Sequence, residues 1–177
     1  TISNPKSKHF GKPANSGAIV RYNISYGTGT GKVLAGAVIA ASDVQVYGNE
    51  FYNLVAIGAD GGHGIQINAD GANSVGHNLA NILVYNNLFH GNAQQGISIF
   101  ANLADVTNLK ILNNTIVSNT GQGIRASASG GHTITIASLA NNLFATNTTY
   151  EIQTSTGVTI TASDYNLLYE PADSLIV

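Results

Sequence analysis

The feature of this sequence that most constrains its fold is a repeat centred on asparagine. The segments "VYNNLFHGN" and "ILNNTIVSN" carry an Asn pair between matching apolar positions, 27 residues apart. Aligned on the second Asn of the pair, the chain holds a series of anchors spaced 26, 38, 27, 28 and 24 residues apart: Asn23, Asn49, Asn87, Asn114, Asn142 and Asn166. Self-similarity at a period of roughly 20 to 50 residues indicates a solenoid.

Positions counted from each anchor predict the interior of this solenoid. Two residues after the anchor, a large apolar side chain recurs after an initial serine: Ser25, Phe51, Phe89, Ile116, Phe144 and Leu168. Short alternating segments such as "GISIF" and "HTITI" bury one face of a strand. Units of this length with about three short strands predict an all-β fold, a right-handed, single-stranded parallel β-helix of about six coils. Coils then stack at about 4.8 Å, and the Asn anchors form a structural ladder.

The chain reads as one domain over residues 1–177. Its length suits a single core, and no change in composition marks a boundary. Residues 1–15 contain three lysines and two prolines and are expected to form a strap or cap. Residues 16–170 hold the coils, and residues 171–177 form an exit segment that begins at Pro171.

Composition limits the classes of function. Charged residues make up 9% of the chain, the net charge is −2, and cysteine is absent. We therefore expect no nucleic-acid partner, no membrane span, no thiol chemistry and no cofactor. The nine acidic residues are scattered, with no two at neighbouring positions of one column. Because glycoside hydrolysis needs two suitably spaced carboxylates, we expect no catalytic centre.

The longest repeat, from Asn49 to Asn87, interrupts the pattern with two Gly-rich insertions. The segments "VAIGADGGHG" and "ADGANSVGHN" contain Asp60, His63, Asp70 and His77. Two loops on one coil would wall a groove or hold calcium, with Asp60 and Asp70 as the first candidate ligands. The alternative is a pair of flexible turns whose aspartates form Asx turns. No spacing here matches a metal-binding loop, so we expect binding without a metal.

Outward positions of the coils supply the candidate site. The alignment places Tyr47 over Tyr85, and Tyr52 over His90, as aromatic stripes that offer flat faces to sugar rings. Gln66, Phe100 and Arg125 point outward from the Gly-Ile strands, and amide and guanidinium groups bind sugar hydroxyls. The predicted ligand-binding residues are Tyr47, Tyr85, Tyr52, His90, Gln66, Phe100 and Arg125. The alternative is that the tyrosines pack beneath the strap or the long loops.

The segments "VRYNISYG" and "ILNNTIVSN" are typical of coils in the pectate-lyase-like superfamily of right-handed parallel β-helices, which the chain resembles over residues 16–170. The resemblance implies a polysaccharide partner. Within that superfamily, a short β-helix with few acidic residues looks most like a non-catalytic carbohydrate-binding module. The resemblance implies that such a module is secreted, that it is appended to a glycoside hydrolase or another enzyme that degrades plant cell walls, and that xylan is a ligand. Two alternatives remain open: a polysaccharide lyase or glycoside hydrolase, and a structural or adhesive segment such as part of a tailspike or surface protein.

Overall fold

The computed structural model describes residues 9–10, 17–27, 33–56, 61–70 and 77–169. The predicted strap lies outside these ranges except for residues 9–10, and the exit segment and Asp60 lie outside them entirely. The described residues form strands and turns. Within them, no helix is long and apolar enough to cross a membrane.

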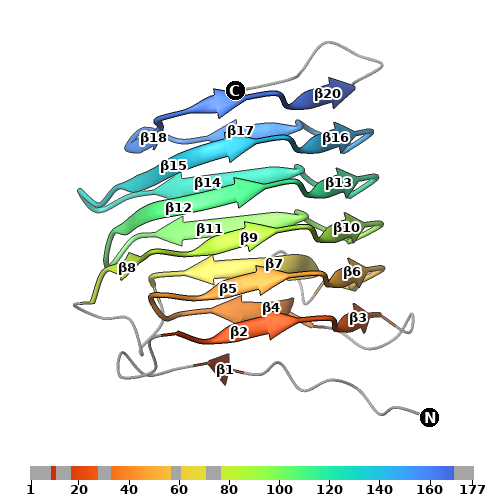
Figure 1. Ribbon diagram of the computed structural model, residues 1–177, viewed down its shortest axis with the longest axis horizontal. Helices are drawn as coiled ribbons and strands as arrows, with labels where there is room; N and C mark the ends of the chain where they lie inside the picture. Colours follow the sequence, from red (N-terminus) through yellow and green to blue (C-terminus); the bar gives the residue numbers. More distant parts are fainter. Residues whose placement is uncertain (1–8, 11–16, 28–32, 57–60, 71–76, 170–177) are drawn as a thin grey trace.

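Three parallel sheets, here called A, B and C, run the length of the molecule, and the chain visits them in the order B, C, A in each coil (Figure 1). Sheet A consists of β1 (His9–Phe10), β4 (Ala35–Ile39), β7 (His63–Asn68), β11 (Ile97–Ala101), β14 (Ile124–Ala128) and β17 (Ile152–Thr154). Sheet B consists of β2 (Ile19–Arg21), β5 (Gln45–Tyr47), β9 (Leu83–Tyr85), β12 (Val106–Leu112), β15 (Ile134–Ala140) and β18 (Val158–Ile160), with β8 (Leu79–Ala80) beside β12 and β19 (Ser163–Asp164) beside β15. Sheet C consists of β3 (Ile24–Tyr26), β6 (Glu50–Tyr52), β10 (Leu88–His90), β13 (Thr115–Val117), β16 (Leu143–Ala145) and β20 (Leu167–Tyr169).

The register between neighbouring strands follows the sequence alignment. Phe89 of β10 pairs with Phe51 of β6 on one side and Ile116 of β13 on the other. In sheet B, Tyr47 pairs with Tyr85. Residues at equal distance from successive anchors therefore lie above one another, and the predicted parallel β-helix of about six coils is confirmed. Coils are numbered 1 to 6 below by their anchors, from Asn23 to Asn166.

The core is a column of apolar side chains inside the three sheets. Phe51, Phe89 and Phe144 are almost completely buried, and the rings of Phe51 and Phe89 stack with centroids 5.3 Å apart. The Gly of each Gly-Ile pair makes room for this column. A Cβ on Gly64 would lie 2.6 Å from Cδ1 of Phe89 and 2.4 Å from the carbonyl oxygen of Gly96. The repeated Gly is therefore a packing requirement of the bore.

The asparagine anchors form a continuous ladder at the turn between sheets B and C. The side-chain amide of Asn87 donates to Oδ1 of Asn114 at 3.0 Å, and that of Asn114 donates to Oδ1 of Asn142 at 3.1 Å. Asn114 Nδ2 also donates to the backbone carbonyls of Val84 and Leu112. Because these amides are buried and fully bonded, the ladder holds the turn in place, as the repeat predicts.

A second ladder stabilises the turn that follows sheet C. Asn92 donates to Asn119, and Asn119 donates to Asn147, both at 2.9 Å. The series ends on a carboxylate, because Asn147 Nδ2 donates to Glu151, which is fully buried. The only buried acid among the described residues thus serves as the last acceptor of a structural ladder.

Candidate ligand-binding groove

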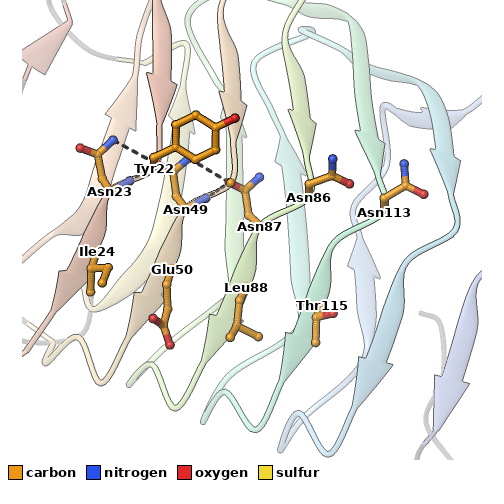
Figure 2. Close-up of a pocket in the computed structure, with 11 residues that line it drawn as sticks. Tyr22, Asn23, Ile24, Asn49, Glu50, Asn86, Asn87, Leu88, Asn113 and Thr115 are labelled. Atoms are coloured by element: carbon orange, nitrogen blue, oxygen red, sulfur yellow. Dashed lines mark hydrogen bonds between the residues drawn. The ribbon is translucent and has the colours of Figure 1, made fainter.

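A shallow groove of about 690 Å³ follows the Asn turn across coils 1 to 4 (Figure 2). One row of lining residues precedes the anchors and the other follows them, with the anchors between the two rows. The lining residues are Tyr22, Asn23, Ile24, Gly48, Asn49, Glu50, Asn86, Asn87, Leu88, Asn113 and Thr115. The groove therefore runs along the helix axis, perpendicular to the strands.

The row before the anchors presents free amides. Asn86 and Asn113 adopt left-handed backbone conformations, with φ of 53° and 54°, which Asn tolerates better than most residues. Both are exposed, and neither side chain has a hydrogen-bond partner among the described residues. Figure 2 shows the two side chains side by side on successive coils. Each offers a donor and an acceptor to a ligand in the groove.

Tyr22 occupies the same row in coil 1 and, like Asn86 and Asn113, is a residue of the groove that the sequence reasoning missed. Its φ is 53°, an uncommon conformation for a bulky side chain and one that costs energy. Tyr22 is 73% exposed, and its ring meets that of Tyr47 edge-on with centroids 5.6 Å apart. It lies over Gly48, where a Cβ would come within 2.8 Å of the ring. The available signal was a Tyr at the position where the next four coils have Gly or Asn.

Stacked rings stand on both sides of the groove. Tyr47 and Tyr85 stack at 4.7 Å with planes 21° apart, and Tyr52 stacks on His90 at 5.0 Å and 3°. Tyr26 extends the second stack at 5.4 Å. The predicted stripes are confirmed as neighbours, but the flat faces within each stack are turned toward one another. The coil spacing of about 4.8 Å is itself a stacking distance, so these rings present edges and hydroxyls outward.

The hydroxyls of the first stack remain available as hydrogen-bonding groups. Nη1 of Arg21 donates to the hydroxyl of Tyr47 at 3.1 Å, and this hydrogen bond raises the pKa of Arg21. Partial burial, followed by the neighbouring Tyr47 and Tyr22 hydroxyls, raises the pKa of Tyr85, which Arg21 opposes. Tyr85 therefore keeps its proton at neutral pH and can donate a hydrogen bond to a ligand hydroxyl.

Glu50 and His90 form a pair beside the groove. Oε1 of Glu50 lies 3.0 Å from Nε2 of His90, and their side chains are 37% and 33% exposed. The alignment predicted an outward His90 but did not single out Glu50. Its column otherwise holds Ile24, Leu88 and Thr115 in the groove, so a carboxylate among mostly apolar residues was the signal that could have identified it.

The predicted site residues divide between two faces. Tyr47, Tyr85, Tyr52 and His90 flank the lining residues of the groove, although none of them lines it. The other three lie on sheet A: Gln66 on β7, Phe100 on β11 and Arg125 on β14. The structure thus does not gather all seven into one site.

On sheet A the three predicted residues have protein partners. Gln66 points away from the bore but is only 5% exposed, and its neighbour Ser98 is buried as well. The guanidinium carbon of Arg125 lies 5.9 Å from the centre of the Phe100 ring, so the outward Phe100 packs against a cation. A ligand would have to displace packed groups to reach Gln66, which makes the groove the more accessible site.

The part of the chain that the structure describes contains no set of side chains that could hold the calcium ion considered above. No group of three or more His, Asp or Glu side chains comes together there. Oδ1 of Asp70 accepts from the backbone nitrogen of Asn102 at 2.5 Å, and Ser129 donates to Asn102 in turn. Asp70 therefore takes part in a coil-to-coil polar column, while Asp60 lies outside the described residues.

Comparison with known proteins agrees with this architecture. No curated protein matches the chain. The family model described as a right-handed β-helix region matches residues 1–140, which is more than half of the sequence. The stacked coils, the Asn ladders and this match together show that the chain belongs to the right-handed β-helix family.

Proposed function

We propose that this chain is a non-catalytic carbohydrate-binding module that holds an extended plant β-glycan, such as xylan, in the groove along the Asn turn. The observation that carries the proposal is the repetition of one chemical unit along an open groove. Asn86 and Asn113 present unpaired amides on successive coils, with stacked aromatic side chains close by. An extended polymer of similar sugar units suits a surface that repeats every 4.8 Å or so.

The contacts differ from those of a flat aromatic platform. Amides and Tyr hydroxyls offer hydrogen bonds to the hydroxyls of the glycan. Stacking comes chiefly from Tyr22, because its ring is exposed rather than enclosed in a stack. The ring of Tyr22 lies over Gly48 on coil 2, where it can contact a glycan bound in the groove.

The number of carboxylates in the groove supports binding rather than hydrolysis. Glu50 is the only acidic residue lining the groove within the described residues. Most glycosidases use two carboxyl groups roughly 5 to 10 Å apart on either side of the scissile bond. We therefore propose a module that works without a metal and is secreted as part of an enzyme that degrades plant polysaccharides, which supplies the chemistry.

Isothermal titration with xylohexaose and cellohexaose tests the proposal. Asn86→Ala and Asn113→Ala should each weaken binding about 5- to 10-fold, as expected for the loss of about 1 kcal/mol of hydrogen bonding. Asn141→Ala is the matched control, because Asn141 has the same backbone conformation one coil beyond the groove. Tyr22→Ala should weaken binding at least as much, since it removes the exposed ring.

Several outcomes would contradict the proposal. Equal effects of Asn113→Ala and Asn141→Ala would show that the groove is not the site. Normal binding by Tyr22→Ala, Tyr47→Ala and Tyr85→Ala would mean that these rings only pack. New reducing ends or unsaturated products after incubation with xylan would favour the hydrolase or lyase alternative.

A structural or adhesive role is a second candidate, because the two end coils expose the same motif. Coil 1 reads Tyr-Asn-Ile-Ser-Tyr at residues 22–26, and coil 6 reads Tyr-Asn-Leu-Leu-Tyr at residues 165–169. The outward residues of both motifs are exposed: Tyr22, Ile24, Tyr26, Tyr165, Leu167 and Tyr169. A head-to-tail contact between copies would continue the Asn ladder and sheet C. Light scattering that shows concentration-dependent chains, abolished by Leu167→Asp, would favour this role.

A further inference from the structure

We propose that the groove selects uncharged glycan chains and that Glu50 is the residue that determines this selection. The inference rests on the proposed function and adds to it a class of ligand. It starts from the charges of the groove. Within the described residues that line it, Glu50 is the only charged side chain, so the lining carries one negative charge and no cation.

Apolar side chains flank Glu50 along the groove. Its neighbours in the column are Ile24 on coil 1 and Leu88 on coil 3. Figure 2 shows the three side chains in one row along the groove. Charges beside apolar side chains are screened less than charges surrounded by water. A negative group on a ligand beside Glu50 therefore experiences repulsion, which salt weakens because the carboxylate is partly exposed.

His90 holds the carboxylate in place without facing the ligand. Its Nε2 lies 3.0 Å from Oε1 of Glu50, and its ring is fixed by stacking on Tyr52. His90 does not line the groove, so it binds Glu50 from the side. Oε2 of Glu50 has no hydrogen bond within the described residues and remains free to accept one from a ligand.

The same carboxylate favours one class of sugar and rejects another. A sugar hydroxyl can donate to Oε2, and a hydrogen bond to an ionised acceptor is about twice as strong as one between neutral groups. A uronate offers a carboxylate in place of the hydroxymethyl group. That carboxylate only accepts hydrogen bonds, so it finds a like charge instead of a donor. Neutral pentose or hexose chains fit the groove, and polyuronates do not.

Two other charges lie near the groove but outside its lining. Arg21 lies beside coil 1, where it donates to Tyr47 and lies 5.8 Å from the centre of the Tyr22 ring. Asp43 lies on the same coil as Glu50 but outside the groove, where Oδ1 accepts a hydrogen bond from Asn81 at 2.8 Å. Asp43 is a matched control because it carries the same charge on the same coil and lies outside the groove. Asn tolerates the left-handed backbone conformation of Asp43, so Asp43→Asn keeps the local structure.

The test compares the wild type, Glu50→Gln and Asp43→Asn by titration with neutral xylohexaose and anionic hexagalacturonate at low and high salt. Each substitution removes one negative charge from coil 2. The wild type should bind xylohexaose at least 10-fold more tightly than hexagalacturonate, with a smaller ratio at high salt. Glu50→Gln should reduce this ratio at least 5-fold, mainly by improving the binding of hexagalacturonate. Asp43→Asn should leave the ratio unchanged.

The outcomes separate this inference from the proposed function. If the wild type binds the two hexamers equally, or hexagalacturonate more tightly, the inference fails while carbohydrate binding stands. An unchanged ratio in Glu50→Gln, or an equal change in Asp43→Asn, also overturns it. If the wild type binds neither these hexamers nor cellohexaose, the proposed function fails and takes the inference with it. Circular dichroism and melting temperatures establish that both variants are folded.

Discussion

The first three coils and the last three coils share one backbone and carry different surfaces. In both halves the anchors form the same ladder, and the residue before each anchor has a left-handed backbone. Two positions before the anchor, coils 2 and 3 have Tyr47 and Tyr85, where coils 4 and 5 have Leu112 and Ala140. Three positions after it, Tyr52 and His90 give way to Val117 and Ala145.

This difference separates what the fold requires from what it permits. Inward columns must match between coils, because each side chain packs against the equivalent one above and below. Outward columns have no such constraint, since short aliphatic residues serve coils 4 and 5 without disturbing the ladder. The aromatic stacks and Glu50 are therefore additions to the first three coils, and function should be sought there and in the groove beside them, which reaches coil 4.

The largest expected effect concerns the ladder that both halves share. Asn114→Leu should lower the free energy of unfolding by roughly 3 kcal/mol or more, because it leaves several buried backbone and amide groups without partners. Asn23→Leu should cost less than about 1 kcal/mol, because Asn23 is exposed at the start of the ladder. Urea denaturation measures both. Equal costs would mean that burial does not determine the strength of the ladder.

Substitutions of Glu151, at the end of the second ladder, test the C-terminal half alone. Glu151→Ala should cost roughly 1 to 3 kcal/mol, because the buried amide of Asn147 loses its acceptor. Glu151→Gln keeps an acceptor oxygen and should cost less than Glu151→Ala in the same denaturation experiment. Glycan binding should survive both substitutions, because Glu151 does not line the groove. If Glu151→Gln is as damaging as Glu151→Ala, the charge of Glu151 matters beyond its role as an acceptor.

Gly48 has a left-handed backbone conformation and lies directly beneath the Tyr22 ring. Gly48→Ala should cost roughly 1 to 2 kcal/mol, because its φ is 63° and the new Cβ would meet the Tyr22 ring. Gly131→Ala is the matched control: its φ is 83°, but its Cβ would meet no atom within 4 Å. Gly48→Ala should also weaken glycan binding by moving Tyr22. Adding Tyr22→Ala to Gly48→Ala should recover part of the lost stability, and no recovery would contradict the proposed contact.

The smallest expected effect is a loss of stability at alkaline pH, caused by Tyr85 in the N-terminal half. Folding raises the pKa of Tyr85, so as pH rises through about 10 the unfolded chain releases this proton first. The contribution of Tyr85 to stability is complete below that pH and is lost as pH rises through the folded-state pKa. Denaturation across alkaline pH should show a flatter decline for Tyr85→Phe than for the wild type. The same slope for both would indicate that other groups cause the decline.

The sequence determined the fold of this protein to an unusual depth. In a solenoid, residues one repeat apart lie above one another, so the period in the chain becomes a distance in space. For this reason the columns of Asn114 and Phe89, and the neighbours Tyr47 and Tyr85, could be predicted from spacing alone. The outward direction of Gln66 and Arg125 followed from strand alternation in the same way.

The tertiary structure decided what those columns do at the surface. Whether Tyr47 and Tyr85 offer faces or edges depends on their rotamers, which the alignment does not contain. Gln66 points outward and is nevertheless buried, and Glu50 meets His90 across 40 residues of sequence. Such features arise where side chains of adjacent coils and loops compete for the same space. Repetition fixes which residues are neighbours, whereas packing fixes which of their atoms remain free to bind a ligand.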